Sequence, residues 1–189
     1  DGSMIRAGVN RVHREEGSTD GDDINIFLAQ YVNTQKMGSA KANLGAAYYY
    51  YDGAKGTTDP YGDSKGGASD TGFKGNSYSN GLYREDYGIL EAFGELKYKD
   101  VMGKPLKTAL ILAYNTLASD DNFGYDLSME YGATKEVGDF KLAATYRGVQ
   151  KDAVYGAHND SDFSGGGTDS KGYYIKGKYK FADNVDLGA

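Results

Sequence analysis

The chain has 189 residues, a formal net charge of −6, 28 glycines, 18 tyrosines, two prolines and no cysteine. The missing cysteines exclude disulfides, thiol catalysis and thiolate metal sites, and the acidic balance argues against nucleic acid as a partner. No stretch approaches the ~20 apolar residues of a membrane helix, and the length suits one all-β domain.

Eight strand-like stretches follow one another along the chain, and no segment has a persuasive helical periodicity. Most stretches exceed the mean soluble strand of ~5–6 residues and match the ~9–11 residues that cross a bilayer at a tilt. The expected strands are Ser3–His13, Asp23–Gln35, Ala40–Asp52, Asp86–Lys99, Leu106–Leu117, Phe123–Lys135, Phe140–Gln150 and Gly172–Phe181.

Several of these stretches alternate between an apolar and a charged set with a period of two residues. In Gly88–Tyr98 the even positions include Leu90 and Leu96, whereas the odd positions include Glu91 and Glu95. Such alternation predicts a sheet with one apolar face and one charged face. The apolar residues expected to point outward are Leu90, Leu96, Leu110, Leu112, Leu127, Met129, Leu142 and Ile175.

The connections alternate between tight turns and long polar loops. The tight turns are Lys36–Ala40, Val101–Pro105, Glu136–Asp139 and Ala182–Asn184, and the longer loops are Arg14–Asp23, Gly53–Glu85, Ala118–Asn122 and Asp152–Ser170. In an up-and-down sheet, consecutive connections fall on opposite edges, so the turns share one rim and the loops share the other. Outer-membrane β-barrels have this asymmetry. The fold class is therefore predicted as all-β, an antiparallel up-and-down transmembrane β-barrel in which this chain supplies about eight strands as one domain, 1–189. A soluble β-sandwich, with its apolar face on a second sheet, remains the alternative.

In a transmembrane barrel the charged set of each strand lines a wet lumen. The candidate pore-lining residues are Glu91, Glu95, Lys97, Asp126, Glu130, Lys141, Arg147, Lys176, Lys178 and Lys180. Acids on one arc opposed by bases on another would orient dipolar solutes. The loop Arg14–Asp23 is acidic, which predicts a mild cation preference that fades with salt.

Tyrosines gather near the predicted strand ends, and one loop is unusually long. Tyr48–Tyr51, Tyr83, Tyr87, Tyr173 and Tyr174 are expected to form a girdle at headgroup level, although β-propensity alone favours tyrosine in strands. The loop Gly53–Glu85 is far longer than a hairpin needs, so it either folds inward and narrows the pore or stays outside as a glycine-rich loop.

The sequence offers little for catalysis or metal binding. Ser161 and Ser164 lie near His158, but in a loop interpreted as flexible, so no catalytic pair is assigned. The acidic residues of the same loop lack the spacing of a helix–loop–helix calcium site and predict weak calcium binding at most. The chain is not expected to be an enzyme, and no catalytic residue, cofactor or metal ligand is assigned.

The segment Gly138–Ala189 contains the run Ser161-Asp162-Phe163-Ser164-Gly165-Gly166-Gly167-Thr168-Asp169. This segment resembles the C-terminal part of the "putative porin" family of Gram-negative outer-membrane barrels. The resemblance implies a larger single-chain barrel of roughly sixteen strands that passes small solutes. Because a further strand starts at Val185–Ala189, the chain is expected to be a fragment that lacks N-terminal strands and the last strand or strands.

Together these observations predict a porin of the bacterial outer membrane, a passive diffusion channel for small hydrophilic solutes and ions. Its expected partners are outer-membrane lipid and those solutes, with a homo-oligomer compatible with the pattern. The first alternative is a non-conducting structural or adhesive outer-membrane barrel. The second alternative is a soluble carbohydrate-binding β-sandwich that uses its loop tyrosines.

Overall fold

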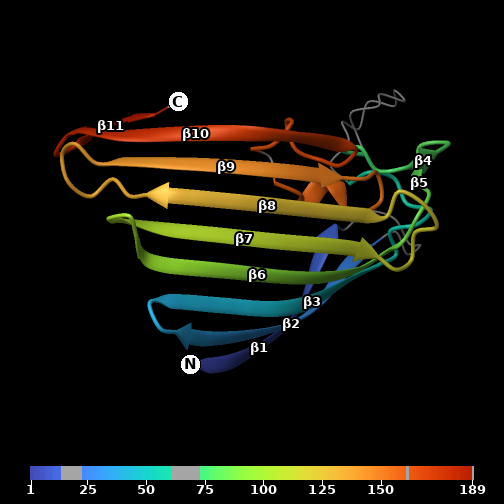
Figure 1. The fold of residues 1–189 in the computed structure, drawn as a ribbon. Helices are drawn as coiled ribbons and strands as arrows, with labels where there is room; N and C mark the ends of the chain where they lie inside the picture. The colour runs from blue at the N-terminus through green and yellow to red at the C-terminus, as the bar shows by residue number, and fades with distance from the viewer. Residues whose placement is uncertain (14–22, 61–72, 161, 189) are drawn as a thin grey trace.

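The computed structural model describes residues 1–13, 23–60, 73–160 and 162–188. Nine strands form one antiparallel sheet in the order β1-β2-β3-β6-β7-β8-β9-β10-β11, and two short strands form a separate hairpin (Figure 1). The strands of the large sheet are β1 (Gly2–His13), β2 (Ile24–Met37), β3 (Ala40–Asp52), β6 (Tyr87–Val101), β7 (Lys104–Asn115), β8 (Phe123–Gly132), β9 (Phe140–Val149), β10 (Ser170–Ala182) and β11 (Val185–Gly188). The hairpin consists of β4 (Tyr78–Ser79) and β5 (Leu82–Tyr83), and the 3₁₀ helix η1 covers Gly156–His158.

All eight predicted strands are present, and each pairs with its neighbour along the sheet. Strand β8 ends at Gly132 rather than at Lys135, so the connection to β9 is longer than the predicted Glu136–Asp139 turn. Gly132 has a φ of +88°, and a Cβ there would lie 2.2 Å from the Phe140 carbonyl oxygen. Only glycine fits this close approach, and the chain leaves the strand there.

The predicted sorting of the connections is confirmed in part. The connections after β2, β6, β8 and β10 lie at one end of the sheet, and those after β3, β7 and β9 lie at the other, where β1 ends and β2 begins (Figure 1). The difference in length does not hold throughout, because the connection after β8 (133–139) is as long as the one after β7 (116–122). We refer to these two ends of the sheet as the turn end and the loop end. Among the described residues, no helix has the length and apolar character to cross a bilayer.

One side of the sheet, which we call the apolar face, is exposed along its length. All eight residues expected to point outward are exposed, from 36% for Leu96 to 69% for Ile175. The registers place them on one side, because Leu110 pairs with Leu127 across β7 and β8, and partners in a register share a face. Within the described parts of the chain, no second sheet covers this face, since the β4–β5 hairpin packs elsewhere.

Aromatic rings frame the apolar face at both ends. Tyr48, Tyr114 and Tyr146 lie toward the loop end, and Tyr131 and Phe140 lie toward the turn end. The predicted girdle is wrong in part, because alternate residues of Tyr48–Tyr51 point to opposite faces. Of the predicted girdle residues, Tyr48, Tyr50 and Tyr173 are exposed on the apolar face, whereas Tyr51, Tyr83 and Tyr87 are buried.

The main buried cluster lies on the opposite side of the sheet, which we call the charged face, and only toward the loop end. Sheet residues such as Tyr51, Tyr87 and Ile89 pack there against loop residues such as Tyr83 and Tyr155. The loops thus supply the layer that covers this end of the sheet. The sheet itself is not closed, since β1 pairs only with β2 and β11 pairs only with β10.

Candidate functional site

The ten candidate pore-lining residues all belong to the charged face. The registers fix this, because Lys97 pairs with Lys107, Asp126 pairs with Arg147, and Lys141 pairs with Lys178. Paired residues share a face, and residues two apart in a strand share it as well. Period-two alternation was therefore sufficient to group these side chains before the strand pairing was known.

Five charged side chains form a ladder across four strands toward the turn end. Lys107 Nζ lies 3.5 Å from a Glu95 oxygen and 3.0 Å from a Glu130 oxygen. Lys97 pairs with Glu95 at 2.8 Å, and Lys141 pairs with Glu130. The side chains alternate in sign along this ladder, so most of their charge is balanced locally.

The ladder continues through neutral side chains toward β2. The Asn43 amide donates to the Glu95 carboxylate at 2.7 Å, and the Thr34 hydroxyl donates to the Asn43 amide oxygen at 2.8 Å. Each of these partners comes from the next strand of the sheet. A continuous polar row therefore crosses the charged face from β2 to β9.

Arg147 is the charged centre nearer the loop end. Its Nε donates to Asp126 at 2.6 Å on the neighbouring strand, and its Nη1 donates to Asp160 at 2.9 Å in the loop after β9. The guanidinium also lies 5.4 Å from the centre of the Phe163 ring. The planar guanidinium can serve several such partners at once. Arg147 therefore fastens the β9–β10 loop to the sheet.

The predicted acidic and basic arcs follow each other along the sheet, with the acids on β6 and β8 and the bases on β9 and β10, and they meet directly at β8 and β9. Acids and bases lie on adjacent strands and pair directly, as Glu130 does with Lys141 and Asp126 with Arg147. Lys176 faces Asp162 at 3.5 Å, and Lys180 faces Asp186 at 3.4 Å. Close pairs largely cancel each other's distant field. Glu91 differs from the other acids, because its partner is the Tyr49 hydroxyl.

Two long connections interlock over the loop end of the charged face. The Asn76 amide donates to the Lys151 and Val154 carbonyl oxygens at 2.6 and 2.8 Å, and its oxygen accepts from the Gly156 N–H at 2.7 Å. In return, the Asp152 carboxylate accepts from the Ser77 N–H at 2.9 Å. Both side chains are only 3% exposed.

Two side chains of the sheet form hydrogen bonds to Asp152 in this junction. Asn115, fully buried on β7, donates to the Asp152 carbonyl oxygen at 2.8 Å, and the Tyr87 hydroxyl donates to the Asp152 carboxylate at 3.2 Å. Buried polar groups of this kind are costly to leave unpaired, so the two loops and the sheet form one unit.

Tyrosines fill the space between the loops and the sheet. The rings of Tyr51 and Tyr155 stack with centroids 4.8 Å apart, and Tyr83 contacts both Tyr87 and Tyr155 edge-on or tilted. Burial raises the pKa of Tyr83 far above its usual range, so this hydroxyl remains a hydrogen-bond donor. Aromatic pairs of this geometry stabilise a core beyond the area that they bury.

The loop after β9 was interpreted as flexible, and for its described residues this is wrong. Ala153 and Tyr155 are buried, as is Phe163. His158 Nδ1 lies 3.0 Å from the Tyr51 hydroxyl, and burial lowers its pKa. The serine expected nearest to it, Ser161, lies outside the described residues.

The acidic residues of that loop do not converge on a common point. Asp160 contacts Arg147, Asp162 contacts Lys176, and Asp169 lies 4.0 Å from Lys151. The Asp162 backbone N–H and the Arg147 guanidinium hold the pKa of Asp160 below its ordinary value. These three carboxylates thus each contact a different cation of the protein and lack the shared centre that calcium needs.

The comparison with protein families agrees with this sheet. The family model described as "Putative porin" matches residues 92–189, just over half of the chain. The chain belongs to this family. The searches of curated proteins and of solved structures returned no match.

The porin match begins inside β6, well upstream of the segment in which the resemblance was apparent from the sequence. It includes every candidate pore-lining residue except Glu91, together with the β9–β10 loop. Strands β1 to β3 lie outside the match but continue the same sheet with unbroken antiparallel pairing. The porin-family sheet and the N-terminal strands therefore share one charged face.

Sequence reasoning missed several residues of this site. Lys107 joins both acids of the ladder, but its strand has apolar residues on both faces, which hid the alternation. The β4–β5 hairpin was also missed, although Asn80-Gly81 is the strongest short hairpin signal and both residues have positive φ. Nothing in the local sequence marks Asn76 or Asp152 as partners.

Proposed function

We propose that the protein is a porin of the bacterial outer membrane, in which small hydrophilic solutes and ions diffuse along the charged face. The observation that carries the proposal is the division of one sheet into an apolar face and a charged face. Monomeric soluble proteins rarely expose contiguous apolar patches beyond a few hundred Å². An apolar face framed by aromatic rings suits lipid and its two interfaces.

In this proposal, the sheet belongs to a closed barrel. The edges β1 and β11 have pairing groups on their outer sides, and closure by further strands satisfies them without water. A barrel of roughly sixteen strands, as the family resemblance implies, leaves an aqueous channel, whereas about eight strands would be filled by side chains.

The pore is narrowed near its loop end by the interlocked loops. Buried residues of both loops, such as Phe73 and Tyr155, lie over the charged face rather than outside the sheet. Solutes would therefore pass beside these loops and then along the ion ladder. The second candidate is a non-conducting structural barrel. It would be favoured if the interlocked loops block the whole cross-section of the barrel.

Planar-bilayer recordings of the full-length protein test conduction directly. We expect stepwise currents, with a mild cation preference that declines as salt rises, since an acidic mouth attracts cations only over about a Debye length. Clear anion selectivity at low salt would show that the basic residues of the charged face, and not the acidic mouth, determine the ion selectivity. A protein that inserts but never conducts would support the structural barrel, and solubility without detergent would support the sandwich.

The role of the two faces is tested by placing arginine on each. Leu112→Arg or Leu142→Arg, on the apolar face, should lower the free energy of unfolding in lipid vesicles by about 2–4 kcal/mol near the bilayer midplane. Ile111→Arg is the matched control, because it neighbours Leu112 in sequence, has similar exposure and lies on the charged face. Equal losses in both variants would contradict the membrane assignment.

Deleting Thr57–Asn76 tests the constriction. The deletion removes Asn76, which joins the two loops, and should raise single-channel conductance. Met102→Gly, at a fully exposed turn on the other end, should leave conductance unchanged. Unchanged conductance in the deletion variant would mean that the loop does not limit flow.

A further inference from the structure

One basic residue of the apolar face, Lys171, is not used by the porin function. The basic residues of this face across β6 to β10 include Lys104, at the turn end of β7, and Lys171, at the loop end of β10. Lys104 pairs with Asp139 at 3.2 Å and lies over the Phe140 ring. A lone cation on a surface that contacts lipid is costly unless a partner balances its charge. Among the described residues, no carboxylate lies within ion-pair distance of Lys171.

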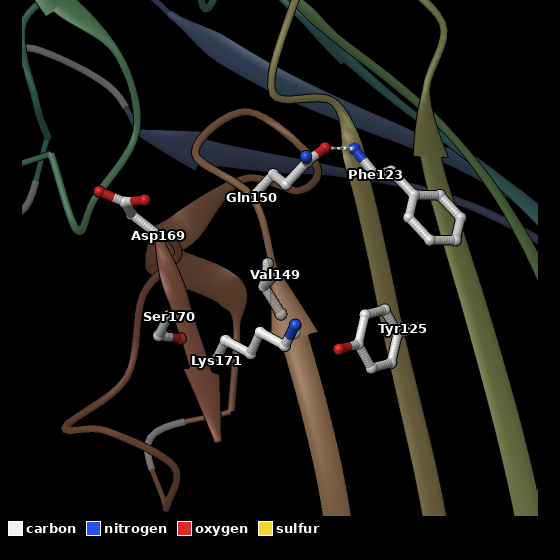
Figure 2. A pocket seen from close by; sticks show the side chains of 8 residues that line it. Phe123, Tyr125, Val149, Gln150, Asp169, Ser170 and Lys171 are labelled. Atoms are coloured by element: carbon white, nitrogen blue, oxygen red, sulfur yellow. Dashed lines mark hydrogen bonds between the residues drawn. The ribbon is translucent and has the colours of Figure 1, made fainter.

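Lys171 borders a pocket of about 280 Å³, formed where one row of the sheet lacks a side chain. Lys171 and Tyr125 both pair with Gly148, which lies between them on β9. A Cβ at Gly148 would lie 2.8 Å from the Tyr125 ring, so glycine is required for that ring to lean over β9. Figure 2 shows the Tyr125 hydroxyl and the Lys171 amino group directed toward each other across this gap.

The residues that line the pocket include one lysine, Lys171, and one carboxylate, Asp169. The Asp169 carboxylate faces Lys151 at 4.0 Å, so its charge is already balanced by another lysine. The Gln150 oxygen accepts from the Phe123 N–H at 2.9 Å, which leaves its amide hydrogens as donors (Figure 2). A lysine, a phenol and an amide together offer an anion both charge and hydrogen bonds.

The surroundings indicate where the anion comes from. Lys171 Nζ lies 5.9 Å from the centre of the Tyr146 ring, and the next residue of the same face, Tyr173, is 77% exposed. These rings belong to the aromatic frame at the loop end, the level at which headgroups meet acyl chains. Below them the face continues through Leu127 and Ile175.

We propose that this pocket binds the phosphate group of a membrane lipid on the outer wall of the porin, with its acyl chains along the apolar face. Lys171 supplies the charge, and Tyr125 and Gln150 supply hydrogen bonds. The proposal rests on the membrane location in the proposed function, because it places this face against lipid. It assigns the lipid to the leaflet at the loop end.

Native mass spectrometry of the full-length protein in detergent, with lipid A as the probe, tests the site. Lys171→Gln should lower the affinity for lipid A about fivefold, the effect of one lysine at an anionic membrane surface. Lys171→Arg should retain binding. Lys178→Gln is the matched control, since Lys178 lies on the same strand but on the charged face, and it should bind lipid A like the parent.

Three further measurements distinguish a lipid-phosphate site from binding through the acyl chains alone and from a site for any anion. Gly148→Ala keeps the lysine but displaces the Tyr125 ring, and should weaken binding as well. An uncharged glycolipid with the same acyl chains should bind poorly to every variant. Inorganic phosphate alone should bind far more weakly than lipid A, and equal binding would overturn the lipid assignment in favour of a solvent-exposed anion site.

Equal binding of lipid A by the parent and Lys171→Gln would overturn the site itself. Bilayer insertion and conductance of the same samples are recorded in parallel. If the parent and the variant both insert and conduct but bind lipid A equally, only this inference fails. If neither inserts, the proposed porin function fails first.

Discussion

The two ends of the charged face are stabilised in different ways. At the turn end, the ladder from Lys97 to Lys141 joins exposed or half-exposed side chains in ion pairs, with no covering layer in the described structure. At the loop end, a buried tyrosine cluster and hydrogen-bonded polar groups such as Asn115 lie beneath the two loops. A single sheet whose apolar face is exposed has no core of its own in the described structure, so the two loops provide the buried core at the loop end.

The largest effect is expected at the loop end. Tyr155→Ala removes a ring that is 1% exposed, and should lower the free energy of unfolding by about 3–5 kcal/mol, as for other large aromatic truncations. Urea titration in lipid vesicles measures this value. Tyr173→Ala is the control, because that ring is 77% exposed, and a comparable loss there would show that burial is not the cause.

The next effect concerns the fastening of the loop. Arg147→Gln leaves the Asp126 carboxylate, 15% exposed, without its cation and releases Asp160. We expect a loss of about 2 kcal/mol and faster hydrogen exchange in the loop after β9. Lys176→Gln, which removes a more exposed pair to the same loop, should change exchange much less. Similar exchange in both variants would mean that Arg147 is not the main fastening.

The local stability of the loop end should depend on pH, whereas that of the turn end should not. Burial lowers the pKa of His158, so its neutral form stabilises the loop end above about pH 6.5, and this contribution is lost as the pH falls below that value. The hydrogen-exchange protection factors of residues 150–158, which correct for the intrinsic dependence of exchange on pH, should therefore fall between about pH 7 and 5, while those of the turn-end residues 137–141 should not. His158→Gln should remove the difference, and a pH response that persists in this variant would assign it to another group.

Asp160 should cause a second loss of stability of the loop after β9 at lower pH. Its pKa is held below the ordinary value, so its contribution is present above about pH 4 and is lost as the pH falls through its own lower pKa. Asp160→Asn should abolish this second loss without affecting the one near neutral pH.

The smallest effect is expected in the ladder. Lys107→Gln breaks two contacts, but this side chain is 39% exposed, and such pairs contribute below about 1 kcal/mol. The more sensitive readout is ion selectivity, because removal of the central cation leaves Glu95 and Glu130 facing each other's charge. Cation preference should increase at low salt, and reversal potentials under a salt gradient measure it. A loss of stability as large as that of Tyr155→Ala would refute the contrast between the ends.

The sequence alone determined the strands, their faces and the two ends. Period-two alternation assigns each residue to a face without knowledge of its partner, which is why Leu112, Leu142, Glu130 and Lys141 were placed correctly. Loop parity depends only on the order of connections, so it also follows from the sequence. The family could be recognised from the loop around Phe163, although its match extends to Ala92.

Only the tertiary structure decided which partners meet. Asn76 and Asp152 belong to the same junction although 76 positions separate them along the chain, and neither residue has a local pattern that reveals it. The same applies to the four consecutive tyrosines at Tyr48–Tyr51, where alternation assigns the faces but not the ring stacked on Tyr51. Periodicity is a property of the backbone and is visible locally. Contacts between loops depend on how two distant segments fold over the same end of the sheet, and no short stretch of sequence contains that information.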